Sequence, residues 1–172
     1  MNKYNGQHVD LAVFDLDGTL IKEDSLVVQI KTLYKLSFFH LVKALITLLL
    51  YGRIKFKSNM HDIIQKIDLQ NRWLDSISID DKILEALRNH ELKQHQIIIA
   101  TAAYRETAIN ILDKFDLHIT LIATTAEANL KGISKILALE PYTKNKCWVY
   151  YGDSRDDTPL FEAADFYYKV NR

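Results

Sequence analysis

Short apolar runs alternate with helical segments along most of the chain, and this alternation restricts the fold more than any other feature. Five runs are predicted to be strands buried on both faces, at 10–14, 97–100, 119–123, 147–151 and 166–170. Helices are predicted between them, at 80–93, 104–115, 133–139 and 158–164. Strands alternating with helices are typical of a parallel sheet covered on both faces. We therefore expect an α/β fold with a Rossmann-like, doubly wound sheet.

One connection is far longer than a crossover helix requires. The first predicted strand ends at residue 14 and the second begins at residue 97. The intervening sequence is helical in character and includes a long apolar segment at 36–51. We expect residues 25–77 to form an inserted all-α cap, while residues 1–24 and 78–172 form the α/β core.

The charge balance of the chain restricts its partners. With 22 basic and 22 acidic residues the formal net charge is zero, which argues against a nucleic-acid-binding protein. Cys147 is the only cysteine, so neither an internal disulfide nor a cysteine-based metal site is possible, and a cytoplasmic location is expected. The stretch from Ser25 to His61 nevertheless contains six basic residues and no acidic one.

The apolar segment 36–51 allows more than one interpretation. Its polar residues Ser37, His40, Lys43 and Thr47 are spaced to form one narrow stripe on a helix that is otherwise apolar. Such a helix can pack at the centre of the cap. Alternatively, it can form a homodimer interface or contact a membrane surface, helped by the basic residues that follow it.

Polar residues collect where the predicted strands end. The first strand runs into Asp15 and Asp17, the second ends in Thr101, Lys131 follows the third, and the fourth runs into Asp153. Because ligands bind at the carboxyl ends of the strands in open α/β sheets, these side chains are predicted to form one site.

The chemistry of these residues suits a phosphate ester and Mg²⁺. Mg²⁺ prefers oxygen ligands and commonly takes one or two carboxylates together with substrate phosphate, here Asp15 and Asp153 with the backbone carbonyl of Asp17. Thr101 and nearby backbone N–H groups can hold phosphate oxygens, and Lys131 can neutralise their charge. A carboxylate can also attack phosphorus, so Asp15 is predicted to be the nucleophile and Asp17 to transfer the proton. Lys135, one helical turn after Lys131, competes for the role of the lysine.

The motifs "DLDGT", "IIIAT", "NLKG" and "GDSRDD" resemble those of the haloacid dehalogenase superfamily, and the long insertion resembles the helical cap of its phosphoserine phosphatase branch. The chain is also similar to domains of this superfamily that are fused to membrane prenyltransferases. The resemblance implies an aspartyl-phosphate mechanism with Asp15 and Asp17 catalytic and Asp157 supporting the metal with Asp15, Asp17 and Asp153. It also implies phosphate binding by Thr101 and Lys131, completed by Gly18, Thr19 and Ala102.

We therefore expect a Mg²⁺-dependent hydrolase acting on a small-molecule or lipid-linked phosphate monoester in the cytoplasm, with association to a membrane surface as an alternative. Two other classes are considered. A receiver-like signalling module also uses aspartates, a threonine and a lysine on a parallel sheet, but it lacks a long insertion after the first strand. A regulatory domain that presents its cap to a membrane enzyme is the other.

Overall fold

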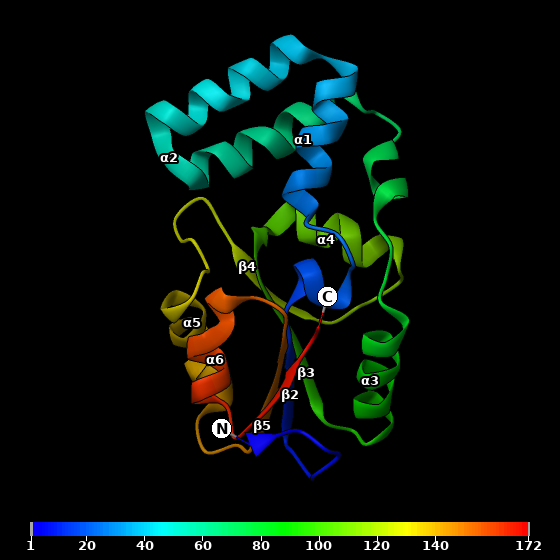
Figure 1. The fold of residues 1–172 in the computed structure, drawn as a ribbon, viewed down its shortest axis with the longest axis vertical. Helices are drawn as coiled ribbons and strands as arrows, with labels where there is room; N and C mark the ends of the chain where they lie inside the picture. Colours follow the sequence, from blue (N-terminus) through cyan, green and yellow to red (C-terminus); the bar gives the residue numbers. More distant parts are fainter. Residues whose placement is uncertain (1, 172) are drawn as a thin grey trace.

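The computed structural model describes residues 2–171, apart from the side chain of Arg155, and contains a six-stranded sheet with helices on both faces (Figure 1). All paired strands are parallel and lie in the order β1-β6-β5-β2-β3-β4. Their bounds are Asn2–Lys3 (β1), Leu11–Phe14 (β2), Gln96–Tyr104 (β3), Thr120–Thr124 (β4), Trp148–Gly152 (β5) and Phe166–Lys169 (β6). The five predicted strands are present, and β1 adds a short edge strand.

Strand β2 lies inside the sheet between β3 and β5, and all four of its residues are buried. Its side chains alternate between two apolar clusters because successive residues of a strand point to opposite faces. Ala12 and Phe14 join the cluster that includes α3 (Asp81–Leu92) and α4 (Arg105–Lys114). Leu11 and Val13 join the cluster that includes α5 (Ile133–Thr143) and α6 (Thr158–Ala163). The predicted doubly wound α/β fold is confirmed.

Helices fill the insertion between β2 and β3: α1 (Ser25–Leu36), α2 (Phe38–Ile67) and a short 3₁₀ helix, η2 (Arg72–Ser76). Helix α2 has two arms, because Gly52 interrupts it with φ 79° and ψ −176°. A left-handed φ is costly for other residues, so glycine is the residue that permits this reversal. Figure 1 shows both arms and α1 above the end of the sheet at which β2 ends.

The chain segments that enter and leave the insertion lie side by side. Ile21 and Ile79 form an antiparallel bridge, and the amide of Lys22 donates to the carbonyl of Ser78 at 2.9 Å. The carboxylate of Glu23 accepts hydrogen bonds from the backbone amide and hydroxyl of Ser78, at 2.8 and 2.7 Å. The two chain connections between the insertion and the core therefore form one paired neck.

The first arm of α2 contains residues 38–51 of the apolar segment, whereas Leu36 is the last residue of α1. Leu41 and Ala44 are buried, whereas most other apolar side chains of the arm are exposed. Within residues 2–171, no helix combines the length and the apolar character needed to cross a bilayer.

Candidate functional site

The loop after β2 brings Asp15 and Asp17 to the carboxyl end of the sheet. The amide of Asp15 donates to the carbonyl of Tyr151 at 2.9 Å, which ties the loop to β5. Gly18 follows with φ 70°, and a Cβ at this position would lie 2.3 Å from an Oδ2 atom of Asp153. The missing side chain of Gly18 therefore leaves room for the Asp153 carboxylate against this loop.

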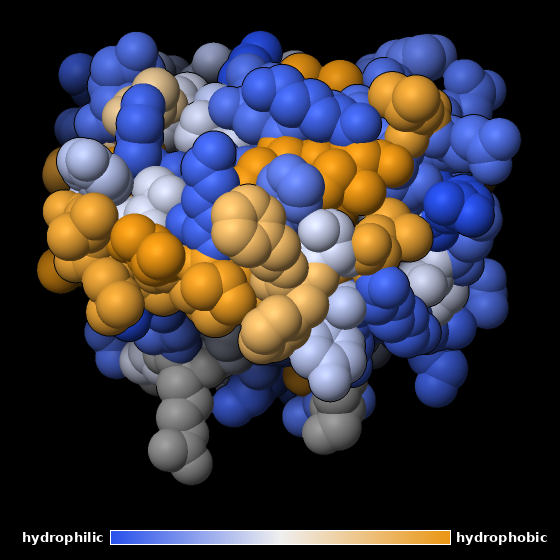
Figure 2. Space-filling model, turned by 90° about the horizontal axis from the view of Figure 1, so that it is seen from above, coloured by the Kyte–Doolittle hydropathy of each residue, from blue (hydrophilic) through white to orange (hydrophobic). Residues whose placement is uncertain are grey.

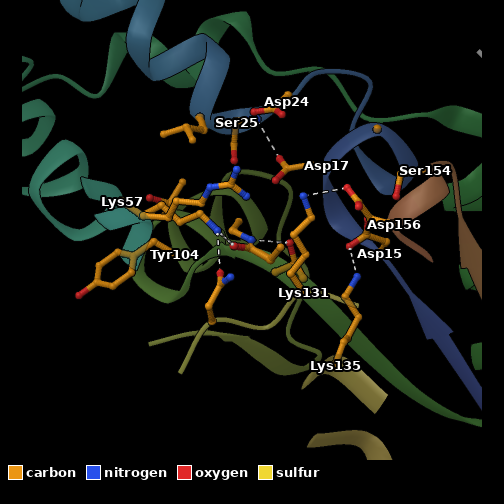
Figure 3. A pocket seen from close by; sticks show the side chains of 18 of the residues that line it. Asp15, Asp17, Asp24, Ser25, Lys57, Tyr104, Lys131, Lys135, Ser154 and Asp156 are labelled. Carbon is orange, nitrogen blue, oxygen red and sulfur yellow. Dashed lines mark hydrogen bonds and ion pairs between the residues drawn. The ribbon is translucent and has the colours of Figure 1, made fainter. Parts of the chain in front are cut away.

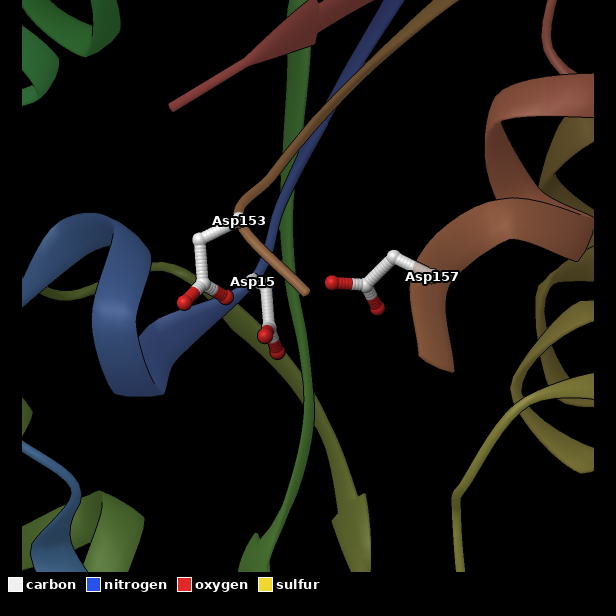
Figure 4. Close-up of side chains that lie close together, drawn as sticks. All are labelled: Asp15, Asp153 and Asp157. Atoms are coloured by element: carbon white, nitrogen blue, oxygen red, sulfur yellow. The ribbon is translucent and has the colours of Figure 1, made fainter. Parts of the chain in front are cut away.

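Three carboxylates meet where β2 and β5 end (Figure 4). One oxygen from each of Asp15, Asp153 and Asp157 lies within 4.8 Å of the other two. Gly152 permits this approach, because a Cβ there would lie 2.9 Å from an oxygen of Asp157. Three carboxylates at this separation, with the space left at Gly18, fit a hard divalent cation.

The lysine that contacts these carboxylates is Lys135, in the first turn of α5. Its Nζ lies 3.0 Å from Asp15 Oδ1 and 3.3 Å from Asp157 Oδ1, and the side chain is 3% exposed. Lys131, the lysine assigned to this position from the sequence, pairs with Asp156 Oδ2 at 2.8 Å and is 42% exposed. Figure 3 shows both lysines in the pocket, with only Lys135 reaching Asp15.

The way in which α5 begins explains why Lys135, and not Lys131, contacts Asp15. Gly132, with φ 57°, ends the loop that carries Lys131, and the helix begins at Ile133. Lys135 and Leu139 are the buried residues of this helix and are four positions apart, so they share its inward face. A lysine on the apolar face of a predicted helix is the sequence signal that favours Lys135.

Opposing effects set the protonation of Asp15 and Lys135. Burial raises the pKa of Asp15 to about 7, Lys135 acts against this rise, and the charge of Asp157 adds to it. Burial alone would lower the pKa of Lys135, but the Asp15 and Asp157 carboxylates outweigh it and raise that pKa. Lys135 is therefore a cation that offsets the acidic cluster.

Asp157 is held from several sides. Its Oδ1 accepts hydrogen bonds from Lys135 and from the hydroxyl of Tyr150, the latter at 2.8 Å. Its Oδ2 accepts from the amide and hydroxyl of Ser154, at 3.2 and 2.8 Å. Burial, together with the nearby carboxylates, raises the pKa of Tyr150 well above its usual value, so the hydroxyl keeps its proton. Tyr150 was not predicted from the sequence, because an apolar strand gives no sign of which tyrosine reaches a carboxylate.

Asp17 is tied to the insertion. Its Oδ1 accepts a hydrogen bond of 2.8 Å from the amide of Ser25, the first residue of α1. Burial raises the pKa of Asp17 to about 6, although the hydrogen bond from Ser25 acts in the opposite direction. A carboxyl group with this pKa can both donate and accept a proton near neutral pH.

The end of β3 supplies Thr101 and Ala102. Thr101 is fully buried, and its Oγ1 accepts from the amide of Ala103 at 3.0 Å. The carbonyl of Ala102 accepts from Lys57 Nζ and from the hydroxyl of Thr124, at 2.5 and 2.9 Å. Thr101, Ala102 and Gly18 line the pocket, whereas Thr19 is fully buried and is not part of its wall.

The pocket has a volume of about 560 Å³ and lies between core and insertion. Its core wall includes the carboxylates and lysines described above, and its opposite wall includes Leu26 and Gln29 of α1 and Leu48, Arg53 and Phe56 of α2. Lys57 crosses between the walls, donating to Ala102 and also to Asn129 Oδ1 at 3.2 Å. Burial lowers the pKa of Lys57, although Asp17 acts against this effect. This contact was not foreseen, since nothing in the sequence of a helix shows that one of its lysines reaches a distant strand.

The protein has a parallel α/β core with a helical insertion. Its site combines three carboxylates with a buried lysine, an arrangement that suits a cation and an anionic group bound together. The sequence profile of the haloacid dehalogenase-like hydrolases matches residues 12–162, so the chain belongs to this family. The predicted family and the predicted class of enzyme, a hydrolase, are thereby confirmed.

Solved structures share the fold across nearly the whole chain. A phospho-aspartyl intermediate analogue of phosphoserine phosphatase has a TM-score of 0.61 and 16% identity, covering 97% of this chain and 86% of the other. A substrate-bound phosphoserine phosphatase has a TM-score of 0.60 and 15% identity, covering 95% and 86%. A predicted phosphatase from Clostridium acetobutylicum has a TM-score of 0.62 and 15% identity, covering 96% and 95%. No curated protein sequence matches the chain.

Proposed function

We propose that the protein is a Mg²⁺-dependent phosphatase that hydrolyses phosphate monoesters through a phosphorylated Asp15. The observation that carries this proposal is the meeting of Asp15, Asp153 and Asp157 with the buried Lys135 at the carboxyl end of β2. Membership of a hydrolase family supports it, as do the phosphatases among the proteins of similar fold.

Asp15 and Asp153 are the residues that would hold Mg²⁺, with the backbone carbonyl of Asp17 as a further oxygen donor. The bound cation supplies positive charge that attracts phosphate oxygens and reduces their repulsion of the nucleophile. Both oxygens of Asp157 already accept hydrogen bonds from protein groups. We therefore assign Asp157 the role of positioning Lys135 and the loop that carries Asp153.

The reaction uses two proton transfers at Asp17. In the first step an oxygen of Asp15 bonds to phosphorus while the bond to the leaving oxygen breaks, and protonated Asp17 gives its proton to that oxygen. In the second step the ionised Asp17 accepts a proton from water, whose oxygen bonds to phosphorus. The bond between Asp15 and phosphorus then breaks, which releases inorganic phosphate and restores both aspartates.

Groups at the ends of β3 and α5 hold the phosphate. The Thr101 hydroxyl accepts from Ala103, so its own proton is available for a phosphate oxygen. Backbone groups of Gly18, Thr19 and Ala102 are proposed to complete the site. Lys135 offsets the charge shared by Asp15 and the phosphate, and Lys131, at the pocket wall, provides a second, more exposed cation.

We propose that residues 25–77 act as a cap over this site, on a core of residues 1–24 and 78–172. The contacts that support this role are the bond between Asp17 and Ser25 and those of Lys57 with Ala102 and Asn129. The upper wall of the pocket combines apolar side chains with Arg53 and Lys57, which suits either a small phosphate monoester or the head of a lipid-linked one.

Turnover of p-nitrophenyl phosphate with Mg²⁺ tests the proposal. We expect Asp15→Asn to abolish turnover while its circular dichroism spectrum stays that of the wild type, and chelation of Mg²⁺ to abolish turnover reversibly. Asp113→Asn, which changes an exposed aspartate of α4, is the matched control and should retain activity. Wild-type turnover by the Asp15→Asn variant would refute the assignment of the nucleophile. A protein that is labelled once by a phosphodonor and never turns over would instead be a receiver-like module.

A further inference from the structure

The insertion exposes a broad apolar surface on the side facing away from the core. Six large side chains of α1 and of the first arm of α2 are more than 60% exposed. We name them the cap patch: Tyr34, Phe38, Phe39, Leu49, Leu50 and Tyr51. Figure 2, which views the molecule from above the insertion, shows apolar side chains gathered in a band across this face. Soluble monomers rarely expose a contiguous apolar area of this kind unless something binds there.

Basic residues accompany the cap patch. Lys31, Lys35, Lys43, Arg53 and Lys55 are all exposed. From Ser25 to His61 the chain has no acidic residue to oppose them. Hydrophilic side chains border the apolar band in Figure 2. Exposed apolar and aromatic side chains on a segment whose charged residues are all basic complement an anionic bilayer, which has an apolar interior and a negatively charged surface.

We propose that the cap patch docks on an anionic lipid bilayer, with the first arm of α2 lying in the plane of the interface. Residues 38–51 span about 21 Å as a helix, less than the roughly 30 Å of a hydrocarbon core. The aromatic rings of Tyr34, Phe38, Phe39 and Tyr51 suit the depth of the lipid head groups. The exposed lysines Lys31, Lys35 and Lys43 lie on α1 and the first arm of α2 and would meet anionic head groups.

Charge favours a bilayer over a second copy of this chain. Two copies that met through the cap patch would bring together the exposed lysines and arginine of both insertions, with no acidic residue between Ser25 and His61 to compensate. Like charges placed opposite each other oppose association. An anionic lipid surface presents the opposite charge.

The cap patch adjoins the wall of the pocket. Leu48 lines the pocket, and the next residue, Leu49, belongs to the patch. Arg53 also lines the pocket and lies two residues after Tyr51 of the patch. A docked molecule therefore holds the upper wall of the pocket close to the lipid head groups. The docking does not depend on phosphatase activity, so it is tested separately from it.

Flotation with phosphatidylcholine vesicles containing about one third phosphatidylglycerol tests the docking. We expect the wild type to float with these vesicles, to float less as salt is raised, and not to float with pure phosphatidylcholine. Phe39→Glu/Leu49→Glu should lower the bound fraction at least about tenfold, because two apolar anchors are lost and two repelled charges are added. Leu69→Glu/Leu92→Glu changes two equally exposed leucines outside the patch and should still float.

Two controls separate the remaining explanations. Circular dichroism and thermal unfolding of Phe39→Glu/Leu49→Glu should match those of the wild type, since both side chains are exposed. The proposal is overturned if the wild type does not bind anionic vesicles or if this double variant binds as the wild type does. A lipid-free wild-type dimer that Phe39→Glu/Leu49→Glu converts to a monomer would also overturn it and assign the patch to a second copy.

Discussion

The carboxylate of Asp17 accepts a hydrogen bond of 2.8 Å from the backbone amide of Ser25, which links the proposed acid and base to the first residue of the insertion. Ser25 is the first helical residue of α1, and Asp24 precedes it as the N-cap with extended backbone, φ −87° and ψ 114°. Any movement of α1 away from the core would change the surroundings of Asp17. The position of the insertion and the readiness of the proton donor are therefore coupled.

Ser25→Pro tests this coupling, because proline lacks the amide hydrogen but is well tolerated at the first position of a helix. The extended backbone of Asp24 is compatible with a following proline. We expect kcat for p-nitrophenyl phosphate to fall by about tenfold, the effect of one lost charge-assisted hydrogen bond. Ser25→Ala keeps the backbone amide hydrogen, so its kcat should fall by less. Equal kcat values for the two variants would show that the amide does not matter.

Lys135→Met should damage both stability and turnover. It leaves the buried Asp15 and Asp157 without their cation, which costs about 3 kcal/mol of unfolding free energy. The exposed Lys131→Met is the comparison and should change unfolding free energy by less than about 0.5 kcal/mol. Urea denaturation of the two variants at pH 7 measures the difference. A larger loss for Lys131→Met would contradict the assignment of Lys135 as the charge partner of Asp15.

Gly18→Ala should weaken the site through steric conflict. The new Cβ would lie 2.3 Å from an oxygen of Asp153, in addition to the cost of φ 70°. Gly6→Ala is matched for backbone strain alone, since Gly6 has φ 83° and no atom within 4 Å of its Cβ position. In both variants the left-handed backbone at the new alanine should lower the unfolding free energy by about 1–2 kcal/mol. Only Gly18→Ala should also raise the Mg²⁺ concentration needed for half-maximal turnover, which a metal titration would reveal.

His90 should make stability depend on pH. The His90 side chain is buried, with its Nδ1 2.7 Å from Nδ1 of His95 and its Nε2 3.0 Å from the hydroxyl oxygen of Tyr151. Burial, together with His95, lowers the pKa of His90 to about 4. In the unfolded chain a histidine has a pKa of about 6.5, so the unfolded state binds more protons between these values. His90 therefore gives its full stability above about pH 6.5 and loses it progressively down to about pH 4.

The measurement is the difference in unfolding free energy between the wild type and His90→Phe across pH 4–8. This difference removes the contribution of other groups, including Asp15 and Asp17, that titrate in the same range. We expect the advantage of the wild type to shrink as the pH falls. A wild-type advantage that grows in acid would contradict the assigned direction.

Most of the fold follows from local patterns in the sequence. Val13, Ile98 and Tyr150 are predictable as strand residues because central parallel strands are buried on both faces and therefore need continuous apolar runs. The neck formed by Ile21 and Ile79 is not predictable in this way, since a single bridge between distant residues leaves no periodic signal. The reversal at Gly52 is indicated only by the presence of a glycine within an apolar helix.

In the site, too, some features follow from local sequence patterns and others depend on tertiary contacts. Asp15 and Asp153 lie close together because each directly follows a strand and the carboxyl ends of parallel strands share one edge, and Asp17 lines the same pocket. The catalytic and metal-binding roles of these aspartates stay predictions. Lys131 was favoured over Lys135 as the lysine that neutralises charge on the phosphate and the nucleophile, but it is Lys135 that contacts Asp15, because the rotation of the helix points Lys135 inward. Lys57 and Tyr150 depend on tertiary packing, which short motifs do not encode.

The paired neck at Ile21 and Ile79 has a consequence for how such proteins diversify. Because both ends of the insertion leave the core at adjacent points, another helical unit can replace residues 25–77 without changing the order of the strands, provided that it restores the contacts of Ser25 and Lys57 with the core. Selection can therefore alter what enters the pocket without rebuilding the chemistry beneath it, and chimeras joined at this junction offer the same freedom to the protein engineer.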